Sequence, residues 1–150
     1  MAFLRTPLTP ARPGGDGGCS AERANEVIIL SLPSSVRAHA EALLQAFCDR
    51  RVPESVRREV RLEAAFRGDI ATIFEHRPPY VSSFLPAREG DEWTRLAIAQ
   101  FRYDAETRLW TLFCADRSSR WHKYAEVDPS ERLEDLIEEV DADPTGIFWG

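Results

Sequence analysis

The hydrophobic positions along the chain follow helical spacing at two places, separated by a long stretch in which they alternate. The first helical stretch begins at Ser34 or Ser35, either of which can cap a helix, and Val52-Pro53 stops it. Its apolar positions recur every three or four residues, at Val36, Ala40, Leu43, Leu44 and Phe47. Because this spacing puts the apolar side chains on one side, it predicts an amphipathic helix with one buried face.

The second helical stretch lies near the C-terminus and has clearer boundaries. Asp128 is expected to cap it, Pro129 to take the first helical position, and Glu131 to complete a capping box. Asp143-Pro144 ends it. The buried stripe of this helix is predicted at Leu133, Leu136, Ile137 and Val140.

Between the two helices, apolar and polar residues alternate with the period of a β-strand. Five strands are predicted, at residues 60–66, 70–74, 93–103, 109–116 and 120–124. Gly68-Asp69 joins the first two strands as a hairpin, and residues 104–107 join the third to the fourth.

Consecutive strands without intervening helices favour an antiparallel meander over a parallel, doubly wound sheet. The predicted fold class is therefore α+β, an antiparallel β-meander of about five strands with an N-terminal and a C-terminal helix. Residues 1–26 are rich in proline and glycine and predict a disordered leader. Residues 27–150 are predicted to form a single domain, because a chain of 150 residues buries one core.

The acidic residues gather at one end of the chain. The net charge is −6, but residues 125–150 hold nine acids and one arginine, a local charge of −8, so the remainder sums to +2. This balance lacks the strong basic field of a dedicated nucleic-acid binder. The widely spaced Cys19, Cys48 and Cys114 indicate reduced thiols and a cytoplasmic protein. No apolar run approaches the ~20 residues that span a bilayer, so no membrane partner is expected.

Charged residues fall on the apolar side of the first hairpin. With a two-residue turn, counting outward puts Glu75 and Arg77 on the same face as Leu62 and Val60. One interpretation is that this pair lines a cleft at the end of the sheet, because partly buried charges beside open space often mark a site. The alternative is a structural ion pair.

The second hairpin gathers arginines and aromatic rings on one face. Pairing Tyr103 with Arg108 puts Phe101 and Trp110 on the core face. Arg95 falls on the same face, opposite Asp116. The other face collects Ile98, Arg102, Phe113 and Arg117, to which the last strand adds His122 and Tyr124. Guanidinium and aromatic groups together stack on bases or hold phosphate. The alternative is that a helix covers this face and the arginines extend past it to water.

No grouping of residues predicts a metal site, a cofactor or a nucleophilic catalyst. His39, His76 and His122 belong to separate elements and lack the spacing of metal ligands. Residues 116–122 are expected to hydrogen-bond within their own turn rather than to catalyse a reaction. The acidic run at 138–143 lacks the glycine and the terminal glutamate of a calcium loop, and we interpret it as a solvated helix face.

Eight short motifs form a set that spans the chain from Val52 to the C-terminus: Val52-Pro53-Glu54 with Val56-Arg57, Glu75-His76-Arg77-Pro78-Pro79, Glu92-Trp93-Thr94-Arg95, Phe101-Arg102-Tyr103, Trp110-Thr111-Leu112-Phe113, Asp116-Arg117, His122-Lys123-Tyr124 and Asp141-Ala142-Asp143-Pro144-Thr145-Gly146-Ile147-Phe148-Trp149-Gly150. With these motifs the chain resembles the bacterial family DUF3024, a domain of unknown function. The closing decapeptide and the Arg-Pro-Pro element are the specific parts. The resemblance implies a shared fold, and it carries no activity, substrate or catalytic residue.

Three functional hypotheses follow. The first is a non-enzymatic binding module for a protein or a small anionic ligand, with binding residues Glu75, Arg77, Arg102, Arg117, His122 and Tyr124. The second is a single-stranded nucleic-acid binder that stacks bases on Tyr124, Phe113 or Trp121, against which the acidic C-terminal helix argues. The third is a small enzyme with Glu75 as acid or base. Monomer and homodimer both stay open, because the apolar tail at 147–149 is costly to leave in water and needs a docking surface.

Overall fold

The structure is a computed structural model that describes residues 32–79 and 92–150. The leader predicted at 1–26 lies outside the described residues, as do residues 27–31 of the predicted domain. The elements in chain order are α1 (Ser34–Arg51), the short 3-10 helix η1 (Glu54–Val56), β1 (Arg61–Arg67), β2 (Ile70–Arg77), β3 (Thr94–Asp104), β4 (Leu109–Ala115), β5 (Trp121–Lys123) and α2 (Leu133–Ala142). The predicted α+β fold, with a helix at each end of an antiparallel meander, is confirmed.

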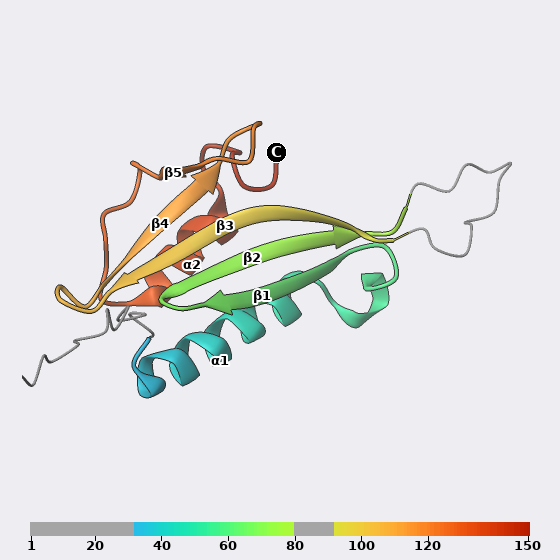
Figure 1. Cartoon of the computed structure of the whole chain (residues 1–150). Helices are drawn as coiled ribbons and strands as arrows, with labels where there is room; N and C mark the ends of the chain where they lie inside the picture. Colours follow the sequence, from blue (N-terminus) through green and yellow to red (C-terminus); the bar gives the residue numbers. More distant parts are fainter. Residues whose placement is uncertain (1–31, 80–91) are drawn as a thin grey trace, which may run out of the picture.

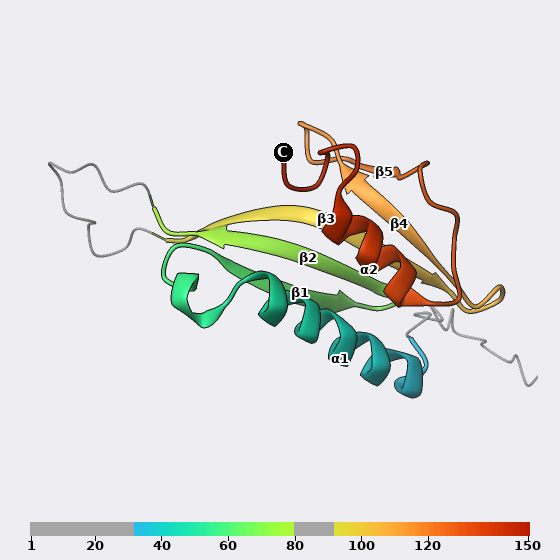
Figure 2. The ribbon, with the colours of Figure 1, turned by 180° about the vertical axis from the view of Figure 1, so that it is seen from behind.

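The five strands form one antiparallel sheet in which the spatial order of the strands is their order in the chain. Both α1 and α2 lie on the same side of this sheet (Figure 2). Figure 1 views the molecule from the other side, where the strands lie in front of α2. We call this second side the open face, since no described helix covers it. It carries the strand residues that alternate with the core positions, among them Arg67, Thr72, Gln100, Phe113 and Trp121.

The hydrophobic core lies between the sheet and the two helices. α1 begins at Ser34 as predicted, but its capping residue is Pro33, whose carbonyl accepts the Arg37 N–H at 2.9 Å, so the predicted serine cap is wrong. The predicted apolar stripes of both helices face the core. The largest fully buried side chains come from helices and strands alike: Phe47, Phe101, Leu44, Ile73, Leu112, Leu133, Leu136 and Val140.

The first hairpin has the register that its turn predicts. Arg67 pairs with Ile70 across Gly68, which adopts the left-handed φ of 61° that glycine tolerates best. Counting outward then pairs Leu62 with Glu75. Both side chains are therefore on the helix-covered side of the sheet, as predicted.

A β-bulge interrupts the pairing between β2 and β3. Ile73 pairs with Ala99 and Phe74 pairs with Ala97, so Ile98 is one extra residue in β3. An extra residue reverses which face the preceding side chains occupy. The first half of β3 is therefore turned over relative to its second half.

This reversal makes two predictions wrong. Ile98 was placed by simple alternation on the face with Arg102, yet it is buried in the core. Arg95 was placed on the core face opposite Asp116, yet it pairs with His76 and lies on the open face. The physical reason in both cases is the bulge, which alternation counted from the hairpin end cannot anticipate.

The pairing register of the second hairpin differs from the predicted one by two residues. Tyr103 pairs with Trp110, not with Arg108, which instead occupies the loop with a φ of 59°. Its N–H donates to the Asp104 carbonyl at 2.7 Å. Because a shift of two residues preserves the alternation, Phe101 still faces the core as predicted.

α2 begins at Leu133, so the predicted start at Asp128-Pro129 is wrong. The preceding segment is used by the sheet instead. The Trp110 N–H donates to the Ser130 carbonyl at 2.7 Å, and the Ser130 N–H donates to the Trp110 carbonyl at 3.0 Å. These bonds pair the backbone groups of β4 at a position where β5 does not pair with it. The Ser130 hydroxyl also accepts the N–H of Arg132 at 3.0 Å.

The C-terminal tail packs on the core of its own chain. α2 ends at Ala142, and its C-cap Asp143 has the left-handed φ of 41°. The Asp143 carboxylate accepts the backbone N–H groups of Phe148 and Trp149 at 3.2 and 2.9 Å. This turn places Phe148 in the core, with its ring centroid 5.1 Å from that of Tyr124. The closing decapeptide thus ends α2 and attaches the C-terminal tail to the core.

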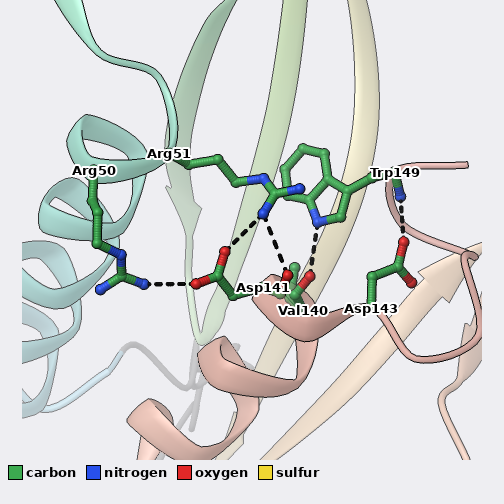
Figure 3. A network of polar contacts seen from close by, with 6 residues as sticks. All are labelled: Arg50, Arg51, Val140, Asp141, Asp143 and Trp149. Atoms are coloured by element: carbon green, nitrogen blue, oxygen red, sulfur yellow. Dashed lines mark hydrogen bonds and ion pairs between the residues drawn. The ribbon is translucent and has the colours of Figure 1, made fainter.

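A polar network fixes Trp149 against both helices (Figure 3). The Trp149 indole N–H donates to the Val140 carbonyl at 2.7 Å, and the Arg51 guanidinium lies 4.0 Å from the indole centroid. Asp141 accepts hydrogen bonds from Arg51 at 2.7 Å and from Arg50 at 3.0 Å. The interpretation of the acidic run as a merely solvated face is therefore wrong, because its carboxylates join α2 to α1 and the tail.

Candidate binding face on the open side of the sheet

The open face holds a cavity of about 640 Å³, which we call the sheet hollow. Its lining comes from β1, β2 and β3 and, across the face, from β5: Ala65, Phe66, Arg67, Gly68, Ile70, Thr72, Phe74, Arg95, Ala97, Gln100 and Trp121. The bulge at Ile98 helps to build it, because only the reversed half of β3 turns Arg95 and Ala97 to this side.

A pair of hydrogen-bonded polar side chains lies among the residues that line the hollow. Gln100 and Thr72 are only 8% and 7% exposed, and the Gln100 amide donates to the Thr72 hydroxyl at 3.2 Å. The Gln100 carbonyl oxygen accepts the Arg102 Nε–H at 2.7 Å. Burying an amide is costly unless it is bonded, and these contacts meet that cost. A glutamine amide has two N–H donors, so the pair keeps capacity for a ligand.

Arginines stack on aromatic rings of the same face. The Arg95 guanidinium lies 3.6 Å from the Phe74 ring centroid, and a nitrogen of Arg95 lies 3.7 Å from a Glu63 carboxylate oxygen. The Arg102 guanidinium lies 3.9 Å from the Phe113 ring centroid. Each stack holds a guanidinium group in place on the face, and a guanidinium group binds carboxylate or phosphate through two of its N–H groups.

The fold separates the charges of the protein by face. The described strands present five basic residues and two acidic residues on the open face: Arg61, Arg67, Arg95, Arg102, Lys123, Glu63 and Asp104. α2, on the other side of the sheet, carries five acidic residues and no basic one, at Glu134, Asp135, Glu138, Glu139 and Asp141. The acidic segment seen in the sequence is thus kept away from the open face.

Of the six residues predicted to bind a ligand, Arg102 is the one on the open face beside the hollow. Tyr124 is 4% exposed in the core, and its hydroxyl donates to a Glu139 carboxylate at 3.2 Å. The prediction that it shares a surface with Arg102 is wrong. β5 turns Trp121 rather than His122 toward the open face, because His122 pairs with the core residue Cys114.

His122 belongs to a tight turn after β4. Its Nε2 lies 2.8 Å from Oδ2 of Asp116, whose Oδ1 accepts the N–H groups of Ser118 and Arg120 at 2.8 and 3.0 Å. These contacts, the His122 bond first, lower the Asp116 pKa to about 2. Arg117 is exposed in the same turn. The prediction that residues 116–122 bond among themselves is confirmed.

Glu75 and Arg77 meet at the far end of the sheet, on the helix-covered side. The Glu75 side chain is 13% exposed, and its Oε1 accepts the Arg77 Nε–H at 2.6 Å. This hydrogen bond is the largest cause of a raised Arg77 pKa. The pair is therefore separated from the arginines of the open face by the sheet itself.

Sequence reasoning missed several residues of the hollow. Thr72, Phe74 and Arg67 follow from the first hairpin's register, because they alternate with the core positions of β1 and β2. Arg95 could not be found in this way, since the bulge decides its face. Among the described residues, no group of three or more His, Cys, Asp or Glu side chains is arranged to hold a metal ion, and no described helix is long and apolar enough to cross a membrane.

Comparison with known proteins identifies one relationship. The model of a domain of unknown function, DUF3024, matches residues 32–150, which include both helices and the whole sheet. Neither a curated protein nor a solved structure matches the chain.

Proposed function

We propose that this chain, a member of the DUF3024 family, is a binding module. The family assigns it no ligand, so the proposal rests on the geometry of the chain itself. The sheet hollow holds an anionic ligand that has a planar ring. The observation that supports this most is the composition of the hollow. Ring faces and guanidinium groups form its sides, and a hydrogen-bonding pair lies among them. A ligand that carries both a ring and a negative charge has a partner for each of these groups.

The size of the hollow suits such a ligand. Its volume of about 640 Å³ falls within the ~300–1,000 Å³ typical of small-molecule sites. Trp121 is partly exposed and offers an indole, the ring with the largest stacking area in proteins. Thr72 and Gln100 would then hold the polar edge of the ring.

The anionic group would be held by Arg67 and Arg95 at the rim of the hollow. Arg95 is oriented before a ligand arrives, because Phe74 lies under its guanidinium group and Glu63 lies beside it. Ordering a side chain costs about 0.5–1.5 kcal/mol on binding, so a group that is already oriented binds more tightly.

Binding is favoured over catalysis by what the hollow contains. The described residues that line it include no carboxylate, imidazole or thiol, and an arginine does not release its proton at ordinary pH. Glu75, the acid or base of the enzyme hypothesis, lies on the other face and is paired with Arg77.

The test is a nuclear magnetic resonance titration of the full chain with the common nucleoside monophosphates and with indole-3-carboxylate. We expect amide shifts at Thr72, Gln100 and Trp121, weaker shifts with inorganic phosphate alone, and loss of binding in Trp121→Ala. Trp93→Ala, which removes a tryptophan outside the hollow, is the matched control. Absence of shifts with every probe at millimolar concentration, or shifts confined to the helix-covered side, would refute the proposal.

A further inference from the structure

We infer that the open face binds single-stranded nucleic acid, with bases against the sheet hollow and phosphates along the arginines. This inference rests on the proposed function and narrows it to one class of ligand. Four features carry it: the sign of the charge on the face, the extent of the face beyond the hollow, the stacks on it, and its polar pair.

The charge of the open face complements a polyanion. Five basic residues stand against two acidic residues, Glu63 and Asp104, on its strands, while the five acids of α2 lie behind the sheet. The packing distance between such layers is about 10 Å, close to one Debye length at physiological salt. The acidic residues of α2 therefore lie about one Debye length or more from phosphates on the open face, with the sheet between them, which weakens the objection that composition raises against nucleic acid.

The binding groups extend farther than a single ring needs. Arg102 stacked on Phe113 lies on β3 and β4, outside the hollow, and Lys123 lies on β5. From Phe74 on β2 to Phe113 on β4 there are two strand spacings, or about 10 Å. A mononucleotide in the hollow would leave Arg102 and Phe113 without a ligand group, whereas a continuous strand would reach them.

The stacks on this face suit unpaired bases. Two guanidinium groups lie over phenylalanine rings. The outer face of each, like the Trp121 indole, can stack on a base while its N–H edge holds a phosphate. A duplex keeps its ring faces covered by neighbouring base pairs, so only a single strand can use these planes. Gln100 and Thr72 can bond to base edges, which a single strand leaves exposed.

The experiment is fluorescence anisotropy on the full chain with labelled single strands of about ten nucleotides, as RNA and as DNA, of mixed sequence. Either strand is expected to bind at least about tenfold more tightly than a nucleoside monophosphate, because it reaches both stacks. With three arginines at phosphates, Arg67, Arg95 and Arg102, the slope of log K against log salt should be about −2, or roughly a 16-fold loss between about 50 and 200 mM.

Variants locate the binding surface. Trp121→Ala should weaken oligonucleotide binding by roughly ten- to a hundredfold, because one base stacked on an aromatic ring contributes about that much to the affinity. Trp121→Phe, which keeps an aromatic ring, should recover part of the lost affinity. Arg95→Ala should weaken binding and make the salt slope shallower by about 0.7. Arg132→Ala removes the same charge from the start of α2 and should leave binding within about twofold.

The outcomes separate the two proposals. Monophosphates that bind the hollow while oligonucleotides bind no tighter would refute the nucleic-acid inference and leave the proposed function standing. A duplex of the same sequence that binds as well as the single strand, or an affinity that does not respond to salt, would also refute the inference. If neither monomer nor oligomer binds, both proposals fail. If a variant does not fold, amide shifts that the oligonucleotide induces in the unsubstituted chain locate the binding surface instead.

Discussion

Replacing Trp149 with alanine is expected to destabilise the protein by about 3 kcal/mol, although the residue is next to last in the chain. The indole N–H bond to the Val140 carbonyl, at 2.7 Å, contributes about 1 kcal/mol. The Arg51 guanidinium, 4.0 Å from the ring centroid, contributes about 0.5–1 kcal/mol. The tilted pair with Phe47, whose ring centroid is 6.4 Å away, adds about 0.5–1.5 kcal/mol.

The assay is equilibrium unfolding in urea, followed by far-ultraviolet circular dichroism. With an m-value of about 2 kcal/mol/M, the midpoint should fall by about 1.5 M while the m-value stays constant. Ile147→Ala is the matched control, because Ile147 lies in the same tail but is 47% exposed, and it should change stability by less than about 0.5 kcal/mol. A Trp149→Ala midpoint within that margin, or equal effects of the two substitutions, would refute the anchoring role.

The same measurement tests whether the tail docks within its own chain. In the structure Phe148 and Trp149 pack on α1, α2 and Tyr124 of one chain. The loss caused by Trp149→Ala should therefore be the same at low and high protein concentration. A loss that varies with concentration would mean that the tail docks on a second subunit.

Two further predictions concern titratable groups. The Asp116 pKa is lowered to about 2 from an ordinary 3.8, chiefly by the bond to His122, so its contribution to stability is present above pH 3.8 and is lost as the pH falls toward 2. Asp116→Asn should flatten stability over that window in acid unfolding curves, and an unchanged curve would contradict the role of the turn. Burial raises the pKa of the Cys48 thiol to about 11, and Cys114 is also buried, so neither thiol should react with iodoacetamide at pH 8 until urea unfolds the chain. Rapid labelling of Cys48 in the folded protein would mean that α1 opens locally.

Local patterns predicted those parts of the fold that depend on neighbours in the chain. The helical spacing from Val36 to Phe47 and from Leu133 to Val140 identified both buried stripes, because a helix face is determined by residues three and four apart. The two-residue turn at Gly68 determined the register of the first hairpin, and with it the side of Glu75. The meander itself followed from the absence of helical spacing between the strands.

The tertiary structure alone decided the candidate site. Whether β3 bulges at Ile98 depends on how this residue packs in the core beside β2, and the bulge determines the face of Arg95. The edge of β4 needed a partner for Trp110, and Ser130 satisfied it, so α2 starts at Leu133 despite a capping signal at Asp128.

Charge shows the same division between sequence and structure. The sequence determined that the acidic residues cluster near the C-terminus and that the remaining chain is slightly basic. Only the packing of α2 behind the sheet decided that these acids face away from Arg67, Arg95 and Arg102. The reason is physical: a period in the sequence determines which side of its own element a residue occupies, whereas the surface it shares with distant residues is determined by how the elements pack.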